Sequence, residues 1–246
     1  MLRTHKIRHQ LGLSIIELLV GVAIGLLILS GAVKLFTDNI TSNRKLVLET
    51  RVNQDMRSAA DLIARDLRRA GFWGNSTSGV VTTNSQPTAA TSPYSAVSPT
   101  STTASTEVTY NYSQGTENNV LDATNESFGF KLDSVNGVLQ YQQGNNWQSI
   151  TDRDTLRISS FSVTPVIKCV ALQQYCTGGS SSSCATCALN AMTGCPTTTC
   201  DNKCPFLALR SYNIALQGTS ATDIAVVRNL QQTVRVRNDQ LIGVCP

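Results

Sequence analysis

One acidic residue, Glu17, stands at the start of an apolar run and is the first candidate for chemistry in this chain. The residues from Leu18 to Val33 carry no charge, and Lys34 ends the run. A charged side chain near the centre of a bilayer costs about 2.5–3.5 kcal/mol on insertion scales, and less near an interface. An acid in such a place needs a partner, and its presence indicates a functional role.

A cut in the chain would create that partner. The first twelve residues are basic and contain no acid, and Gly12 precedes Leu13. If the leader is removed after Gly12, the new amine of Leu13 lies one helical turn from Glu17. The amine of one copy could then pair with the carboxylate of a neighbouring copy within the lipid.

This order of residues resembles the class III signal of type IV pilins and pseudopilins. That signal has a short basic leader, a glycine, an apolar residue, Ser or Thr, two apolar residues, Glu and an apolar helix, and the resemblance covers about residues 6–36. It implies cleavage between Gly12 and Leu13 by a prepilin peptidase and N-methylation of Leu13. It also implies assembly into a pilus or pilus-like fibre, with Glu17 in subunit registration. Leu13 departs from the Phe that the family usually has.

Two other interpretations of the N-terminus stay open. A plain signal anchor explains the basic leader and the apolar run but not Glu17. A cleaved secretory signal could use the small residues Ser30-Gly31-Ala32, but Glu17 would then lie inside its apolar region. We favour the pilin signal.

Length and composition restrict the function further. The 246 residues suffice for one long helix and one globular domain. The leader contributes three of the four net positive charges, so the cleaved chain is nearly neutral and gives no argument for nucleic-acid binding. Both histidines, His5 and His9, lie in the leader. The rest of the chain therefore has no histidine for catalysis or metal binding, and we expect no enzyme, no cofactor and no metal.

A single long helix is predicted over residues 13–70, because this stretch has no proline. Its first part, 13–35, is apolar and predicts a transmembrane or fibre-core segment. Its second part is amphipathic, and Gly71 is a natural stop signal. Apolar residues at spacings of three and four form one stripe: Val52, Met56, Ala59, Ile63, Leu67 and Ala70.

The end of this predicted helix, residues 66–74, resembles the corresponding stretch in minor pilins of the PilW type. Its Arg-Arg-Ala-Gly order is also similar to that of J-type pseudopilins of type II secretion. Phe72 and Trp73 are expected to anchor the helix end to the globular domain.

The remaining residues, 71–246, predict a β-rich periplasmic or extracellular domain. The Ser/Thr-rich stretch 75–106 shows no periodicity and predicts a loop or linker. Pro165 is expected to mark an edge strand or a strand end. Strand patterns occur at 108–112, at 128–132 and 137–141 as a hairpin, and at 156–158, 161–163, 207–216 and 233–238. The predicted fold class is α+β and pilin-like: a long N-terminal helix packed on a mainly antiparallel sheet with a disulfide-rich insert.

All eight cysteines lie at or after residue 169, seven of them in the insert 169–204. An even number in a chain that crosses a membrane favours disulfides. A zinc or iron–sulfur site would instead use Cys184 and Cys187 with Cys200 and Cys204. A thioredoxin-like pair at Cys184 and Cys187 would lack the strand-to-helix setting that lowers a thiol pKa. No full connectivity is predicted for the eight: Cys169, Cys176, Cys184, Cys187, Cys195, Cys200, Cys204 and Cys245.

Together these features predict a minor pilin of the PilW type. The resemblance implies that it primes type IV pilus assembly, sits at or near the pilus tip, and supports pilus biogenesis, adhesion, twitching motility or DNA uptake. The implied partners are prepilin peptidase, other minor pilins, the major pilin, a tip adhesin and the inner-membrane assembly machinery, with no direct nucleic-acid partner. The implied location is the bacterial inner membrane, with one span and a periplasmic C-terminal domain, and then the pilus at the cell surface.

Two alternatives remain. A J-type minor pseudopilin of type II secretion would share the same signal and fold. A membrane-anchored periplasmic enzyme could use the acid pair Asp152 and Asp154, although a solvated turn before a strand explains these residues more simply.

Overall fold

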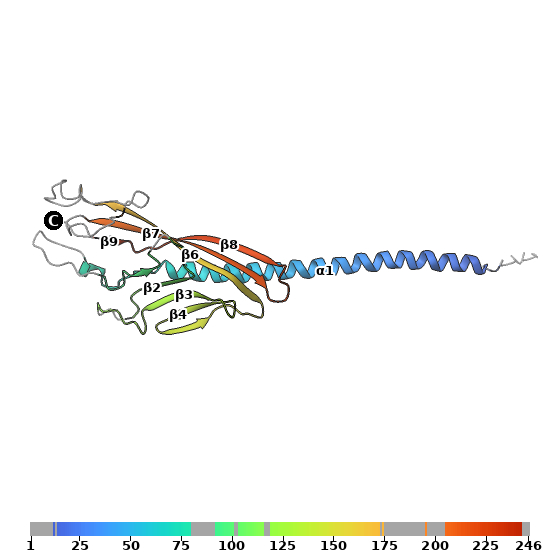
Figure 1. The fold of residues 1–246 in the computed structure, drawn as a ribbon, viewed down its shortest axis with the longest axis horizontal. Coiled ribbons are helices and arrows are strands. Elements are labelled where there is room, and N and C mark those ends of the chain that lie inside the picture. Colours follow the sequence, from blue (N-terminus) through green and yellow to red (C-terminus); the bar gives the residue numbers. More distant parts are fainter. Residues whose placement is uncertain are drawn as a thin grey trace, which may run out of the picture. The chain divides into compact units, whose positions relative to one another are not determined.

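The computed structural model describes residues 12, 14–79, 92–100, 103–115, 119–172, 174, 195 and 205–242. The chain divides into two compact units, Met1–Val47 and Leu48–Pro246, and we call the second unit the head. Figure 1 shows the elements in order along the chain: α1 (Ile15–Leu67), η1 (Ser76–Gly79), β1 (Val97–Ser98), β2 (Glu107–Asn111), β3 (Ser127–Asp133), β4 (Val138–Gln143), β5 (Asn146–Ser149), β6 (Leu156–Ala171), β7 (Phe206–Ser220), β8 (Val227–Arg235) and β9 (Gln240–Ile242).

The long helix that the sequence predicts is confirmed as α1. Ser14 precedes it, and the Ser14 carbonyl accepts the N–H groups of Glu17 (3.0 Å) and Leu18 (3.1 Å). Gly71 follows it with a positive φ of 74°, which glycine adopts at low cost. Within the head, α1 buries one face, as the spacing of its apolar residues predicts: Val52, Met56, Ala59, Ala60, Ile63, Ala64, Asp66 and Leu67.

The first sheet is antiparallel and has the order β1-β2-β3-β4-β5. The predicted hairpin is confirmed as β3 and β4, with Leu132 opposite Leu139. Asp133 begins its turn and accepts the backbone N–H groups of Val135 and Asn136, while Gly137 takes a positive φ of 65°. The alternating pattern of this region thus fixes both the strands and their register.

The second sheet is also antiparallel, with the order β6-β7-β8 and with β9 paired to β7. The two short strands predicted at 156–158 and 161–163 form a single strand, β6, interrupted by a register shift between Ile158 and Ser160. Pro165 lies within β6, which is an edge strand of this sheet, so proline marks an edge but not an end. The strand β8 begins at Val227, six residues before the predicted start, because its exposed polar residues hide the alternation.

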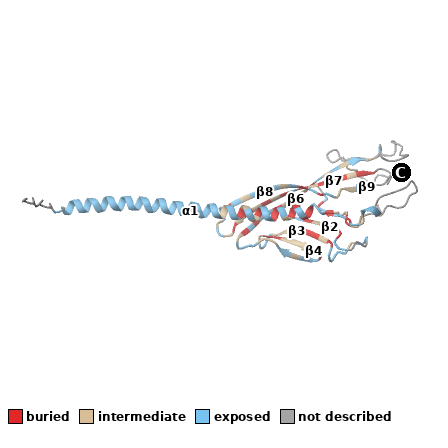
Figure 2. Cartoon of the chain, turned by 180° about the vertical axis from the view of Figure 1, so that it is seen from behind, coloured by how far each residue is buried: buried red, intermediate tan, exposed pale blue. Residues whose placement is uncertain are grey.

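The core of the head lies between α1 and the two sheets. Figure 1 shows β2, β3 and β4 on one side of the helix and β6, β7 and β8 on the other, and Figure 2 marks buried residues in all three of these layers. The apolar stripe of α1 and the inward side chains of both sheets form one hydrophobic cluster. The prediction of one sheet is therefore refined to two sheets that pack on the buried face of the helix.

Two expectations for the chain after α1 need correction. The stretch 75–106 is not all loop, because it contains η1, β1 and the fully buried Tyr94, whose hydroxyl donates to Glu126. Trp73 is buried and its Nε1 donates to Asn119 Oδ1 at 3.1 Å, as an anchor would, whereas Phe72 is 48 % exposed. Phe72 therefore does not anchor the helix end.

The apolar stripe of α1 gives a direct stability prediction. Ile63 is fully buried in the core, whereas Ser58 is exposed on the opposite face of the same helix. Replacing Ile63→Ala should lower the free energy of unfolding by about 2–5 kcal/mol, since it removes buried methyl groups and leaves a cavity. The control Ser58→Ala should change it by less than about 0.5 kcal/mol. Urea unfolding of the detergent-solubilised chain, followed by tryptophan fluorescence, measures both, and equal effects would contradict this packing.

Candidate functional site

The N-terminal part of α1 holds the residues that the sequence predicts for processing and assembly. Gly12 is exposed, and no heavy atom lies within 4 Å of the position that a Cβ would occupy there. Glu17 lies exposed in the first turn of α1 and forms no ion pair with any described residue. Leu13 lies outside the described residues. The chain as described therefore presents Gly12 and Glu17 without supplying a partner for the acid.

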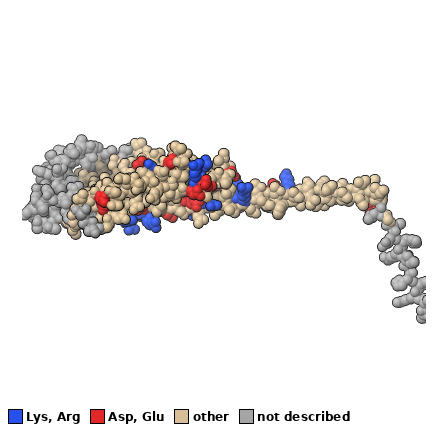
Figure 3. Space-filling model, turned by 90° about the horizontal axis from the view of Figure 1, so that it is seen from below, with Lys and Arg blue, Asp and Glu red and all other residues tan. Residues whose placement is uncertain are grey.

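The apolar surface that follows Glu17 is uncovered. Every described side chain of α1 up to Val47 is exposed, and the most apolar 18-residue window has a mean hydropathy of 2.4 with none of it buried. Residues 15–33 span about 28 Å as a helix, close to the roughly 30 Å of a bilayer core. In Figure 3 this part of α1 consists almost entirely of uncharged side chains, while basic and acidic side chains mix on the head. By length and composition, α1 can anchor the chain in a membrane.

The other end of α1 is fastened to the first sheet through a buried acid, Asp66. Its side chain accepts hydrogen bonds from Tyr110 (2.6 Å to Oδ2) and from Tyr112 (3.2 Å to Oδ1). Arg69 lies one turn on, 3.6 Å from Asp66, with its guanidinium 4.2 Å from the centre of the Tyr112 ring. Tyr112 in turn stacks on Phe128 with ring centres 3.9 Å apart. Because a buried acid without partners is costly, these contacts specify how the helix end sits on the sheet.

The electrostatics of this cluster favour neutral tyrosines. Burial, and after it the Asp66 carboxylate, raises the pKa of Tyr110 well above its usual 10.0. The same two causes raise the pKa of Tyr112, and they raise the pKa of Tyr141 to about 12. A phenolate here would lose water and face a nearby negative charge, so the hydroxyl groups remain donors over the physiological range.

The same helix end is also fastened to the second sheet. The turn that follows α1, residues 68–70, offers backbone carbonyl groups to neighbouring segments. The Arg68 carbonyl accepts the N–H of Arg237 at 3.1 Å, and the Ala70 carbonyl accepts Asn238 Nδ2 at 3.1 Å. The N–H of Gly71 donates to the Asn111 carbonyl at 2.8 Å, which returns the chain to the first sheet. Both sheets therefore hold the end of α1.

A buried arginine, Arg210, supports this junction. Its Nη1 donates to the Ser95 carbonyl (2.7 Å) and its Nη2 to the Asn238 carbonyl (3.0 Å). Burial lowers the pKa of Arg210 from its usual value. A Cβ at Gly71 would come within 2.9 Å of Arg210 Nη2, so the approach of the guanidinium favours glycine there.

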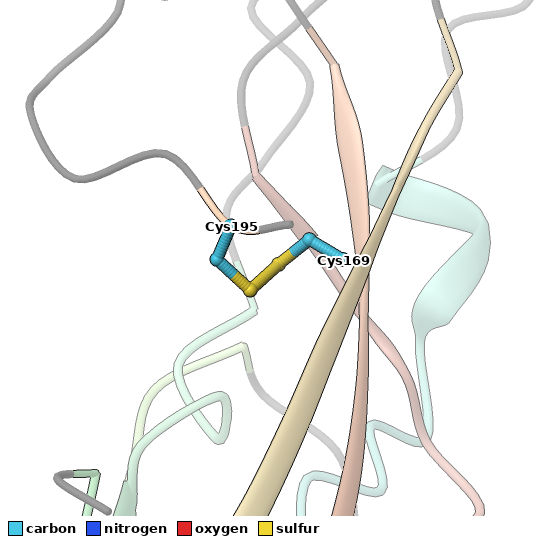
Figure 4. Close-up of a disulfide and its surroundings, with 2 residues drawn as sticks. All are labelled: Cys169 and Cys195. Atoms are coloured by element: carbon cyan, nitrogen blue, oxygen red, sulfur yellow. A yellow bond between two sulfur atoms is a disulfide. The ribbon is translucent and has the colours of Figure 1, made fainter. Parts of the chain in front are cut away.

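The cysteine region is described only in part. Cys169, in β6, forms a disulfide with Cys195, with a Cα–Cα distance of 4.7 Å (Figure 4). The other six cysteines lie outside the described residues: Cys176, Cys184, Cys187, Cys200, Cys204 and Cys245. The four cysteines of the zinc and redox alternatives are among them, so these alternatives stay predictions.

The acid pair Asp152 and Asp154 lies in an exposed turn before β6. Asp152 Oδ1 accepts the backbone N–H of Asp154 at 2.9 Å, and the Asp152 carbonyl accepts the N–H groups of Thr155 and Leu156. This is the solvated turn that the simpler interpretation of the pair predicts.

Comparison with protein families assigns the head to a known family. The sequence model of the family described as PpdB, prepilin peptidase-dependent protein B, matches residues 45–236, more than half of the chain. This chain belongs to the PpdB family. It is therefore a pilin-like protein, and prepilin peptidase is the partner that the family description names. The match excludes Gly12 and Glu17, so PpdB membership and the N-terminal signal are independent observations. No curated protein and no solved structure matches the chain.

Sequence reasoning missed the residues that hold the PpdB head to its helix. Asp66 looks like one more exposed charge of an amphipathic helix, and Arg210 like an ordinary strand residue. The alternation of Tyr110 and Tyr112 indicated that these two side chains share the inward face of a strand. No feature of the sequence indicated that Asp66 is buried against them.

The tyrosine cluster predicts a loss of stability at alkaline pH. Tyrosines whose folded-state pKa is raised stabilise the fold fully below their unfolded pKa, near 10, and lose that contribution as pH rises toward their folded pKa, about 12 for Tyr141. The free energy of unfolding should therefore fall between pH 10 and about 12. Urea unfolding over this range, with phenolate absorbance recorded in parallel, measures it.

A matched pair of variants tests whether the charge of Asp66 contributes to this alkaline loss of stability. Asp66→Asn removes the charge that opposes the phenolates, so the alkaline decline should become shallower, whereas the exposed Asp61→Asn should leave it unchanged. A wild-type free energy that stays flat throughout this range would contradict the account of the cluster.

Proposed function

We propose that this chain is a minor pilin of the PilW type that primes assembly of a type IV pilus. The observation that carries the proposal is the pairing of a PpdB-family head with an uncovered apolar helix whose first turn holds Glu17. Large exposed apolar surfaces indicate an interaction with a membrane or with other proteins. A helix that enters a membrane first and a fibre afterwards uses the same surface for both.

Processing links these two stages. Prepilin peptidase removes residues 1–12 and Leu13 is methylated, which leaves a positive amine one turn before Glu17. The amine of one subunit pairs with the Glu17 carboxylate of a neighbour, which lowers the cost of an acid in an apolar environment. Glu17 thereby registers the incoming subunit in the fibre.

The remaining parts of the proposal follow from the resemblance of the N-terminal signal and of residues 66–74. The subunit starts in the bacterial inner membrane with its head in the periplasm and reaches the cell surface at or near the pilus tip. There it works with other minor pilins, the major pilin and a tip adhesin, and supports adhesion, twitching motility or DNA uptake. Its role is structural rather than enzymatic.

A second candidate is a J-type minor pseudopilin of type II secretion. It is supported by the Arg-Arg-Ala-Gly order at residues 68–71, which that class shares, and the PpdB description fits both systems. The long Cys-rich insert and the Ser/Thr-rich stretch make the chain longer than such a pseudopilin needs, which favours the pilus.

The processing step predicts a defined mass change. The chain extracted from membranes of cells with prepilin peptidase should lack residues 1–12 and carry one additional methyl group. The chain from cells without the peptidase should keep residues 1–12. Intact-mass spectrometry distinguishes the processed from the unprocessed chain. Cleavage after Ala32 in both strains would show a secretory signal and overturn the proposal.

The charge-pairing step predicts a separate phenotype for Glu17→Ala. This variant should enter the membrane at least as well as the wild type, because it removes the only acid of the apolar segment. Its incorporation into sheared fibres should fall strongly, since the neighbour's amine loses its partner. Asp38→Ala, which removes an exposed acid of the same helix beyond the apolar segment, serves as the control. Normal fibre incorporation of Glu17→Ala would refute the pairing.

A further inference from the structure

The exposed side of α1 within the head is rich in arginine and contains no lysine. Along this side lie Arg51, Arg57, Asp61 and Arg65, and Arg68 and Arg69 continue it past the end of the helix. Among the described residues, Arg69 alone of these arginines has a carboxylate within ion-pair distance, that of Asp66. Arginine binds carboxylates through a planar fork of donors, so a row in which only Arg69 pairs with a described acid suits an acidic partner from outside.

The row ends in a cluster at one end of the head. Arg237 joins it, because its backbone N–H donates to the Arg68 carbonyl at 3.1 Å, and the side chain of Arg237 is exposed. We call Arg65, Arg68, Arg69 and Arg237 the arginine patch. Two acids lie near these four arginines, the buried Asp66 and the exposed Asp61 one turn before Arg65, so the patch keeps an excess of positive charge at the surface.

The opposite end of the head carries the complementary charge. The turns before β4, before β6 and after β7 meet there, because Ile158 N–H donates to the Gly137 carbonyl (2.8 Å) and Ala221 N–H to the Thr155 carbonyl (3.2 Å). These turns hold four aspartates, which we call the aspartate loops: Asp133, Asp152, Asp154 and Asp223.

The carboxylates of the aspartate loops form no ion pair with any described residue. Those of Asp133, Asp152 and Asp223 accept hydrogen bonds from nearby backbone or amide groups. Three bases lie close by: Arg153 donates to Asn136 Oδ1 at 3.2 Å, Arg157 is the second residue of β6, and the charge of Lys131 helps to lower the pKa of Asp133. With the ion pair of Glu49 and Arg228, which also lies at this end, five acids face four bases, so the end keeps a net negative charge.

The two charged ends do not neutralise each other within one head. The ion pair of Arg228 with Glu49 places the start of the head's helix at the aspartate loops, whereas Arg68 lies at its far end. Nineteen residues of helix separate Glu49 from Arg68, or about 28 Å. This separation is several times the Debye length of about 8 Å at physiological salt.

We propose that the arginine patch receives the aspartate loops of a second copy of this chain. Apolar side chains stand beside both charged surfaces: Phe72 is 48 % exposed next to Arg69, while Val135 and Ile224, at 91 % and 80 %, lie on the aspartate loops. The contact is head-to-tail, so it repeats along an open array rather than closing a dimer. This inference rests on the proposed function, because it names the surfaces through which such subunits meet.

Charge reversal at each end tests the proposal. The full chain, in mild detergent, is prepared as two differently labelled populations, and their association is measured by energy transfer. Arg65→Glu with Arg68→Glu should weaken self-association at least about tenfold, and so should Asp152→Lys with Asp154→Lys. Mixing the two double variants should restore association, because each then meets a complementary end. Added salt should weaken the wild-type contact.

The controls separate this contact from other causes. Arg44→Glu with Lys45→Glu changes the charge equally outside the head and should leave association unchanged. Thermal unfolding checks that each variant folds. The proposal is overturned if the charge-reversed variants self-associate as well as the wild type, or if mixing the two double variants does not restore association. It is also overturned if the arginine patch binds duplex DNA and the chain does not self-associate. A chain that prepilin peptidase leaves uncut, yet that associates in this way, would contradict the proposed function and not this contact.

Discussion

The structure depends on one helix whose two parts have different surroundings. In the head, α1 buries a stripe of apolar residues between two antiparallel sheets, with Ile63 and Leu67 fully enclosed. Before the head, all its described side chains are exposed, although they are among the most apolar of the chain. No part of the described chain covers this surface. We propose that lipid covers it first and other subunits afterwards. Glu17 adds the requirement that the cover includes a positive charge or allows contact with water.

The C-terminal end of α1 is fixed to both sheets of the head. Asp66 with its two tyrosine donors holds it to the first sheet, and Arg237 and Asn238, which follow β8 of the second sheet, bind carbonyl groups of the turn after the helix. Gly71 turns the chain back at the point where Arg210 approaches. A displacement of α1 within the head therefore disturbs both sheets. PpdB membership, which rests on residues 45–236, covers this junction.

Much of the fold could be predicted from local patterns. The absence of proline and the apolar spacing predict α1, and alternation predicts β2, the β3–β4 hairpin and β7. The missed features depend on distant contacts. The burial of Asp66 follows from tyrosines more than forty residues away, and the continuation of β6 past Pro165 follows from its edge position. Phe72 was expected to be buried because it is aromatic, but the turn at Gly71 directs only Trp73 inward. The roles of Gly12, Leu13 and Glu17 were predicted from the resemblance of the N-terminal residues to a prepilin signal, and they stay predictions.

The central claim is that the uncovered part of α1 exchanges lipid for other subunits. A photoreactive phenylalanine derivative placed at Leu27, which is 75 % exposed, tests this most directly, with the fully buried Ile63 position as the internal reference. Without the assembly machinery, position 27 should crosslink to lipid, and with machinery and prepilin peptidase it should crosslink to the helices of other pilin-like subunits. Position 63 should crosslink only within its own head in both cases. Crosslinks from position 27 to its own head, or the same products with and without the machinery, would contradict the account.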